Sequence, residues 1–287
     1  MYIDTHAHLV TPDFNDDRDE VIERARQAGV EAIIVPGTDL QSSHEAVGLA
    51  QKYDFIYACV GVHPHEASSG NAGVLREIEL LSQHKKVVAI GEIGLDFHYD
   101  FSPREKQIEV FKDQLEIAVR RNLPVVIHTR QSIPETIGAI RETLKENSYW
   151  RMDQTPPYSR FPAPKGVFHC FSGDGATAWE LLNMGFFVSF PGIVTFKNSN
   201  VTETVQKVGI DHLMLETDSP YMTPVPLRGK RNEPANVRLI AEKIAELCDS
   251  TIDDVARSAR YNAKKLFGIG QPDPPVIAYK MYNSLYL

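Results

Sequence analysis

Six residues that commonly bind divalent metal ions stand where short apolar runs of the sequence end. They are His6, His8, Glu92, His128, His169 and Asp218. Residues i and i+2 of an extended chain point to the same side, so His6 and His8 can face one ion. Four imidazoles and two carboxylates exceed what one tetrahedral zinc with an open position needs. We therefore expect two ions, roughly 3.5–4 Å apart, which is the arrangement of many hydrolytic sites.

Each of the six residues has an expected role. Glu92 is the natural bridge, because a carboxylate offers two oxygens. His6, His8 and Asp218 would complete the shell of one ion, and His128 and His169 that of the other. Asp218 would also accept the proton of a water that the ion acidifies. The mixed nitrogen and oxygen donors admit Zn²⁺, Mn²⁺ or Co²⁺, with Mg²⁺ less suited beside four imidazoles.

The strength of this interpretation is the coincidence of positions. A single histidine at a strand end is more often an ordinary polar residue than a ligand, and His-x-His alone is a weak motif. The chain has ten histidines, and four of them stand at the same end of their strands together with two carboxylates. We therefore favour a metal centre over the ordinary interpretation.

Three further residues are candidates for binding substrate. His63 follows the third apolar run, where a barrel would turn it towards the same mouth, although a loop-fixing histidine beside proline is an equally good interpretation. Ser172 could help to bind an anion at a helix start, and a helix cap is the stronger alternative. Arg231 belongs to a basic cluster that suits a phosphate clamp or a solvated loop.

Two neighbours of the metal candidates have expected structural roles. Strand alternation directs Cys170 away from His169, so we expect a small buried hydrophobe there. Glu216 shares the side of Asp218 and is expected to orient a ligating imidazole.

Eight apolar runs predict the strands that must position these residues. They are Tyr2–Asp4, Ala32–Val35, Phe55–Val60, Val87–Ile90, Val125–Ile127, Gly166–Phe168, Phe186–Phe190 and Leu213–Leu215. Amphipathic stretches lie between them. One opens at Ser102, which is expected to cap a helix that begins at Pro103, and the last opens at Thr251. This alternation predicts an α/β protein with a (β/α)8 TIM barrel, and a doubly wound open sheet is the alternative. We expect the barrel to span residues 1–269, with a C-terminal extension at 270–287.

Composition excludes several other classes of protein. The 287 residues are 43% hydrophobic and 24% charged, which suits a globular chain. The net charge, 30 − 38 = −8, argues against a broad nucleic-acid-coating face but permits a local phosphate site. Three widely spaced cysteines do not form a disulfide framework. Neither a membrane span nor a signal peptide is visible, so we expect a cytoplasmic protein with no membrane partner.

Eight motifs, in this order, resemble the TatD family of metal-dependent deoxyribonucleases, within the amidohydrolase-like barrels. They are Ile3–Leu9, Gly61–Ala67, Ala89–Asp100, Val126–Arg130, His169–Asp174, Thr195–Asn198, Leu215–Met222 and Arg228–Val237. The resemblance spans nearly the whole chain up to Ile269. It implies that the six residues named above bind the metal ions and that the chain hydrolyses DNA phosphodiesters, often from a strand end. The chain departs from the family at 145–165, which looks longer than usual, and at 271–287.

Three hypotheses about function remain open from the residues. The first is a metal-dependent deoxyribonuclease acting on DNA ends or single strands, with aromatic residues of 145–165 stacking on bases or merely packing in the loop. The second keeps the metal ions but cleaves acyl or ester bonds in a small molecule or an aminoacyl-tRNA. The third is a metal-bound interaction module without turnover, against which the complete ligand set argues. The sequence leaves the oligomeric state open.

Overall fold

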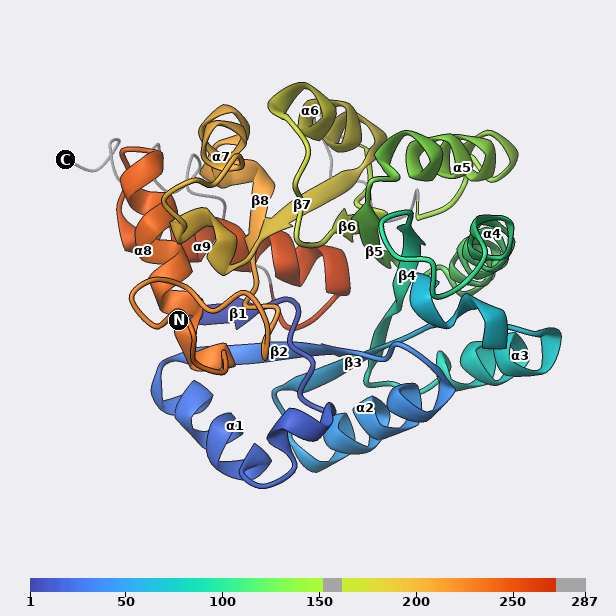
Figure 1. Cartoon of the computed structure of the whole chain (residues 1–287), viewed down its shortest axis with the longest axis horizontal. Helices are drawn as coiled ribbons and strands as arrows, with labels where there is room; N and C mark the ends of the chain where they lie inside the picture. The colour runs from blue at the N-terminus through green and yellow to red at the C-terminus, as the bar shows by residue number, and fades with distance from the viewer. Residues whose placement is uncertain (152–161, 272–287) are drawn as a thin grey trace.

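Eight parallel strands run around a barrel in the order of the sequence, and helices cover its outside (Figure 1). The structure is a computed structural model that describes residues 1–151 and 162–271. The strands are β1 (Tyr2–Asp4), β2 (Val30–Pro36), β3 (Ile56–Val60), β4 (Val87–Asp96), β5 (Val125–Arg130), β6 (Gly166–Phe168), β7 (Phe186–Phe190) and β8 (Leu213–Leu215). All eight predicted strands are present, and β2, β4 and β5 are longer than predicted.

The barrel closes between its first and last strands. The backbone N–H of Thr5 donates to the Leu215 carbonyl, and that of Asp218 donates to the His6 carbonyl. A parallel bridge between Ala7 and Ser219 continues this seam. An open doubly wound sheet would leave β1 and β8 unpaired at opposite edges, so the structure confirms the (β/α)8 barrel.

The helices fill the connections between strands, and most lie outside the ring in Figure 1. They are α1 (Arg18–Gln27), α2 (Leu40–Lys52), α3 (Ala72–Leu81), α4 (Arg104–Arg121), α5 (Ile133–Glu146), α6 (Gly175–Met184), α7 (Thr202–Val208), α8 (Val237–Leu247) and α9 (Ile252–Phe267). None of the helices in the described residues is both long and apolar enough to cross a membrane.

Side-chain caps fix some of the helix starts. The Thr251 side chain accepts the Asp254 N–H at the start of α9, as the sequence predicts. The predicted cap of α4 at Ser102 is wrong, because Pro103 occupies the cap position and α4 begins at Arg104. The Ser102 hydroxyl instead donates to the His65 carbonyl and accepts the Ser68 N–H, joining two loops near the carboxyl ends of the strands.

Two apolar clusters hold the barrel together. The larger one lies between the strands and the surrounding helices. The smaller one combines strand residues such as Cys59, Val126 and Val167 with Leu266 and Phe267 from the end of α9. It fills the inside of the barrel and closes it at the amino ends of the strands. The polar site is therefore confined to the opposite end.

The described part of the 145–165 segment lies at the amino ends of the strands. Trp150 is 1% exposed, donates from Nε1 to the Leu123 carbonyl and packs against Phe186. Leu123 precedes β5 and Phe186 begins β7, so this ring cannot stack on a substrate at the carboxyl ends. The expectation of base stacking is wrong for Trp150, since a connection from helix to strand returns to the far end of a barrel. Tyr158, Phe161 and the expected extension from 272 to 287 lie outside the described residues.

Candidate metal centre

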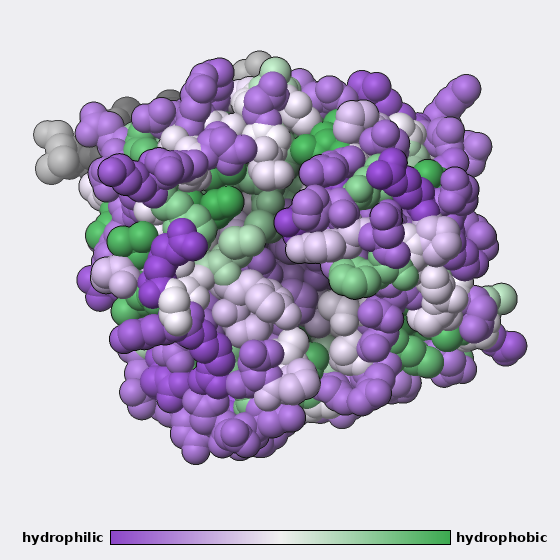
Figure 2. Space-filling model, viewed as in Figure 1, coloured by the Kyte–Doolittle hydropathy of each residue, from purple (hydrophilic) through white to green (hydrophobic). Residues whose placement is uncertain are grey.

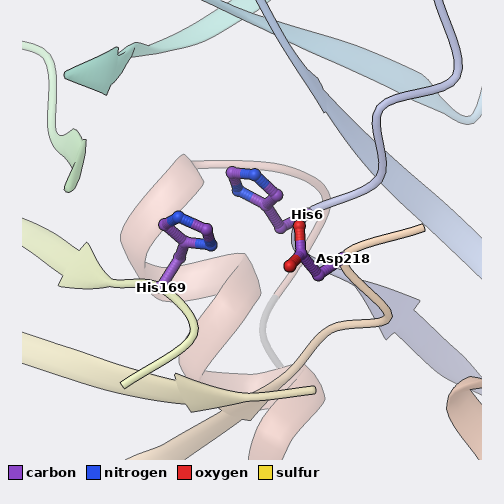
Figure 3. A group of neighbouring side chains, drawn as sticks. All are labelled: His6, His169 and Asp218. Atoms are coloured by element: carbon purple, nitrogen blue, oxygen red, sulfur yellow. The ribbon is translucent and has the colours of Figure 1, made fainter. Parts of the chain in front are cut away.

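The six predicted metal ligands meet at the carboxyl ends of the strands. In Figure 3, His6 from the segment after β1, His169 from the end of β6 and Asp218 from the segment after β8 point toward one another. A pocket of about 960 Å³ opens here. Its lining includes His8, Glu92, His128, His169 and Asp218, and His6 lies beside it. Figure 2 shows this face, with a hollow near its centre.

Alternation along the strands explains this convergence. Cys59, Val126 and Val167 face the inside of the barrel. Residues two or four positions further on share that side. The same alternation carries His128 and His169 to the pocket. β4 and β5 extend past the ligands, so Glu92 and His128 lie within strands and not after them.

Glu92 stands at the middle of the centre, and each of its oxygens faces different histidines. Oε2 lies 3.3 Å from His6 Nε2 and 3.6 Å from His8 Nε2. Oε1 lies 2.8 Å from His169 Nε2, 3.1 Å from His128 Nδ1 and 3.4 Å from His63 Nε2. The carboxylate therefore divides the imidazoles into two groups, one on each oxygen.

Three sets of ligand atoms are close enough to hold an ion, with all atoms of a set within 4.8 Å of one another. They are His6, His169 and Asp218; His6, His8 and Glu92; and His63, Glu92 and His128. His63, which the sequence suggested as a substrate contact, thus stands among the potential ligands. The available signal was strand alternation, because Cys59, Gly61 and His63 share one side of the strand and its continuation.

The residues present fit divalent ions. Glu92 Oε2 is buried and has no hydrogen-bond partner among the described residues. His6 Nε2 and His8 Nε2 lie 3.1 Å apart, so two imidazole nitrogens face one point. A buried carboxylate oxygen and converging imidazoles are the donors that Zn²⁺, Mn²⁺ and Co²⁺ prefer. A cation at this point would satisfy atoms that the protein alone leaves unpaired.

Electrostatics keep both carboxylates ionised. Burial alone would raise the pKa of Glu92, but interaction with the imidazoles of His169, His63 and His6, the last two of which carry charge only in acid, lowers it well below its usual value. Burial opposes ionisation of Asp218 as well, and its hydrogen bond to His8, together with interaction with His169 and His6, lowers its pKa. Asp218 Oδ1 lies 3.5 Å from His8 Nε2.

The histidines divide into neutral and protonated groups. Burial lowers the pKa of His6 and of His63 to about 4, so both imidazoles are neutral near pH 7. Burial also disfavours charge on His169, but the Glu92 carboxylate outweighs it and raises the pKa of His169 to about 9. Without an ion, His169 therefore carries the proton that balances part of the carboxylate charge.

The loop that carries Asp218 is fixed by buried polar residues. The Asp4 carboxylate accepts both the backbone N–H and the hydroxyl of Thr217. Burial raises the pKa of Asp4 to about 7 despite these hydrogen bonds. Asn232 is fully buried and donates from Nδ2 to the carbonyls of Thr217 and Tyr221. Sequence analysis did not predict these roles of Asp4 and Asn232, because they depend on tertiary contacts, which for Asp4 and Thr217 join residues 213 positions apart.

Asp96 is a further residue that sequence analysis missed. It is fully buried at the end of β4, and its Oδ2 lies 2.8 Å from His65 Nε2 and 3.2 Å from His128 Nε2. Its Oδ1 accepts the backbone N–H of His98 and of Tyr99. Burial opposes ionisation, but these hydrogen bonds hold the pKa of Asp96 far below its usual value. The available signal was its position four residues after Glu92 on the same strand.

Glu216 and Cys170 differ from expectation. Glu216 Oε1 lies 3.9 Å from His169 Nδ1, beyond hydrogen-bond range, and accepts the Cys170 N–H, while Oε2 accepts the Ser189 hydroxyl. Cys170 is partly exposed and lines the pocket, so its expected burial is wrong. β6 ends at Phe168, and the strand alternation behind the expectation therefore stops before Cys170.

The two other predicted substrate contacts have different surroundings. Ser172 is exposed and lines the pocket, whereas Asp174 caps α6. Arg231 is not among the pocket-lining residues. Its guanidinium donates to both carboxylate oxygens of Asp17 and lies over the Phe14 ring. Arg231 thus joins the segment after β8 to the segment after β1, and its role as a phosphate clamp stays a prediction.

Comparison with known proteins relates the whole barrel to one family. Residues 3–268 match the family model described as TatD related DNase. A Bacillus subtilis (strain 168) protein called uncharacterized metal-dependent hydrolase YabD is 43% identical over 270 residues, covering 94% of this chain and 100% of that protein. A Pantoea ananatis protein named 3'-5' ssDNA/RNA exonuclease TatD is 34% identical, covering 93% of this chain and 99% of its own.

A solved structure gives the same result. The Escherichia coli K12 TatD homologue YJJV superimposes with a TM-score of 0.83 and 29% sequence identity, and the match covers 94% of this chain and 98% of that one. Together with the (β/α)8 barrel and the histidine and carboxylate cluster, these similarities place the chain in the TatD family of metal-dependent hydrolases.

Proposed function

We propose that the chain is a deoxyribonuclease that hydrolyses phosphodiester bonds of DNA, acting on single strands from their ends. It would use two divalent ions, one on each side of Glu92. The observation that carries the proposal is the position of Glu92, whose two oxygens each face a separate group of imidazoles. This is the geometry that a bridging carboxylate of a two-ion hydrolase requires.

The same geometry supports a ligand assignment. His6, His8 and Asp218 would bind one ion with Glu92 Oε2, and His128 and His169 the other with Oε1. His63 lies 3.4 Å from Oε1 and is a second candidate for this side. Ions bound here would acidify a water molecule and offset negative charge that develops on phosphate oxygens.

Asp218 is proposed as the proton acceptor. Its side chain lines the pocket, and its lowered pKa keeps it ionised and able to take a proton near neutral pH. The oxygen of the attacking water would form a bond to phosphorus while one of its protons passes to Asp218. The bond from phosphorus to the departing sugar oxygen would break with its electron pair on that oxygen, which takes a proton from solvent. Glu92 is 2% exposed, so its task is to hold the reacting groups in place and not to exchange protons with solvent.

The preference for ends of single strands has two supports. The reacting groups are buried at the base of a pocket, which a terminal nucleotide can enter more easily than a continuous duplex. The Pantoea relative is named for exonuclease activity on single-stranded DNA and RNA. A net charge of −8 also disfavours binding along an extended duplex.

Replacement of Asp218 by Asn tests this proposal with Mn²⁺-loaded protein and end-labelled single-stranded DNA. We expect kcat to fall by about 10²–10⁴, with bound metal measured in parallel because Asp218 is also a proposed ligand. Glu180→Gln is the matched control, since this surface carboxylate pairs with Arg141. Linear strands should be shortened and circular strands left intact. Wild-type protein that cleaves neither, but hydrolyses esters, amides or aminoacyl-tRNA, would overturn the nuclease assignment.

A further inference from the structure

An exposed pair of aromatic rings stands on the rim of the metal-centre pocket, in the segment between β4 and α4. Phe101 is 66% exposed and Tyr99 is 38% exposed. The two rings are stacked, with centroids 5.3 Å apart and an interplanar angle of 27°. Tyr99 lines the pocket, and Phe101 stands beyond it. We call this pair the rim platform.

The surrounding residues hold the rim platform in place. The His65 ring lies edge-on to both members, with centroid distances of 5.5 Å to Tyr99 and 4.8 Å to Phe101. The Tyr99 N–H donates to Asp96 Oδ1, and the other oxygen of Asp96 faces His128. One buried carboxylate thus connects the platform to a proposed metal ligand. A ligand that binds a surface already ordered in this way loses less free energy to ordering.

Charge is distributed unevenly around the pocket. Arg130, at the end of β5, is the only lysine or arginine that lines it, and no carboxylate in the described residues pairs with it. Its guanidinium lies 4.7 Å from the centroid of the Tyr99 ring. Asp39 and Glu45 line the side that follows β2, and Glu66 lines the side that follows β3. Arg130 therefore gives a phosphate a cationic contact beside the platform, and the walls after β2 and β3 repel it.

We propose that the rim platform stacks an unpaired base of a single-stranded nucleic acid, while Arg130 contacts an adjoining phosphate. This rests on the proposed function and adds how the strand is recognised. Stacking on an aromatic ring requires a base whose face is free and tolerates any base. In a duplex both faces of an internal base are covered. The platform would therefore select single strands without selecting their sequence.

Phe101→Ala and a set of abasic oligonucleotides test this inference. Mn²⁺-loaded protein is assayed on a short oligothymidylate. It is also assayed on a series of the same oligonucleotide in which each member carries one abasic residue at a different position from the end. In the wild type, we expect one position at which the abasic residue lowers kcat/KM by about tenfold. In Phe101→Ala that dependence on position should disappear, and binding of the intact oligonucleotide to metal-free protein, measured by anisotropy, should weaken about tenfold.

Two variants control for shape and exposure. Phe101→Trp keeps a broad aromatic ring and should preserve the abasic effect. Tyr149→Ala removes an equally exposed ring, 63% exposed, from the opposite end of the barrel and should leave kcat/KM and binding at wild-type values. Thermal melting and size-exclusion chromatography of each variant report folding and association between copies.

The outcomes separate this inference from the proposed function. If wild-type protein hydrolyses the oligonucleotide but shows no abasic effect, or Phe101→Ala shows the same effect as the wild type, the platform is refuted and the nuclease function stands. If the wild type does not hydrolyse oligonucleotides at all, the proposed function fails. A change of oligomeric state in Phe101→Ala without a change in oligonucleotide binding would also refute the platform, because the ring would then serve contacts between copies.

Discussion

Replacing Asp96 by Asn should disable one of the two proposed ion positions and spare the other. In the wild type, Asp96 Oδ2 accepts from His128 Nε2 at 3.2 Å, so the proton of the neutral imidazole lies on Nε2 and Nδ1 is free to face Glu92. An asparagine can keep its oxygen on the N–H groups of His98 and Tyr99. Its NH₂ group would then donate to His128 Nε2 and force the proton onto Nδ1.

The structure indicates how large the effect should be. Loss of a residue that orients a metal-ligating histidine typically lowers metal affinity by 10–100-fold. His6 and His8 lie on the other oxygen of Glu92, and within the described residues the Asp96 carboxylate pairs with His65 and His128 and with neither of these two. We therefore expect about a 10–100-fold loss at the position that includes His128 and little change at the position that includes His6 and His8.

Titration calorimetry with Mn²⁺, together with electron paramagnetic resonance, measures this directly. The wild type should bind two ions whose spins are coupled, whereas Asp96→Asn should bind one ion tightly and give an uncoupled signal. Glu180→Gln, which removes one surface charge far from the centre, is the control. Two tight, coupled ions in Asp96→Asn would refute the assignment of Asp96 as the residue that positions His128.

Three further predictions concern the pKa of His169 and the surroundings of Trp150 and Arg231. Because the pKa of His169 is about 9 without an ion, a metal ion that binds to this imidazole must displace its proton. Mn²⁺ affinity should therefore rise with pH up to about 9, and calorimetry in buffers of different ionisation enthalpy should detect the proton that is released. Trp150→Ala should lower the free energy of unfolding by about 3–5 kcal/mol in denaturant titrations, while kcat of the folded enzyme is unchanged. Arg231→Ala breaks an exposed ion pair to Asp17, so it should cost no more than about 1 kcal/mol and leave the KM for oligonucleotides unchanged; an increase of tenfold or more in KM would restore the phosphate clamp.

The barrel could be predicted from the sequence because buried parallel strands appear as continuous apolar runs. β1, β6, β7 and β8 have the predicted limits. The limits of β4 and β5 could not be predicted in the same way. The predicted runs end at the first polar or glycine position, but Glu92 and His128 continue the strands and face a pocket instead of an apolar layer.

The site could be predicted only as far as residue types and strand ends allowed. Convergence of the six ligand candidates follows from topology, since all parallel strands end on one face. The role of Asp96 could not be inferred, because it depends on where His65 and His128 lie. Ser102 and Arg231 have typical sequence contexts for a cap and a clamp, but tertiary partners, the His65 carbonyl and the Asp17 carboxylate, engage them instead.

The seam between β1 and β8 sets the order in which the catalytic end can be assembled during synthesis. The carbonyl of His6 accepts from Asp218, and the N–H of His8 donates to the Ser219 carbonyl. A nascent chain on the ribosome that has not yet reached residue 218 lacks both contacts, although five of the six ligand candidates have already been made. The complete set of ligand candidates, and with it the proposed two-ion site, is therefore assembled late in synthesis.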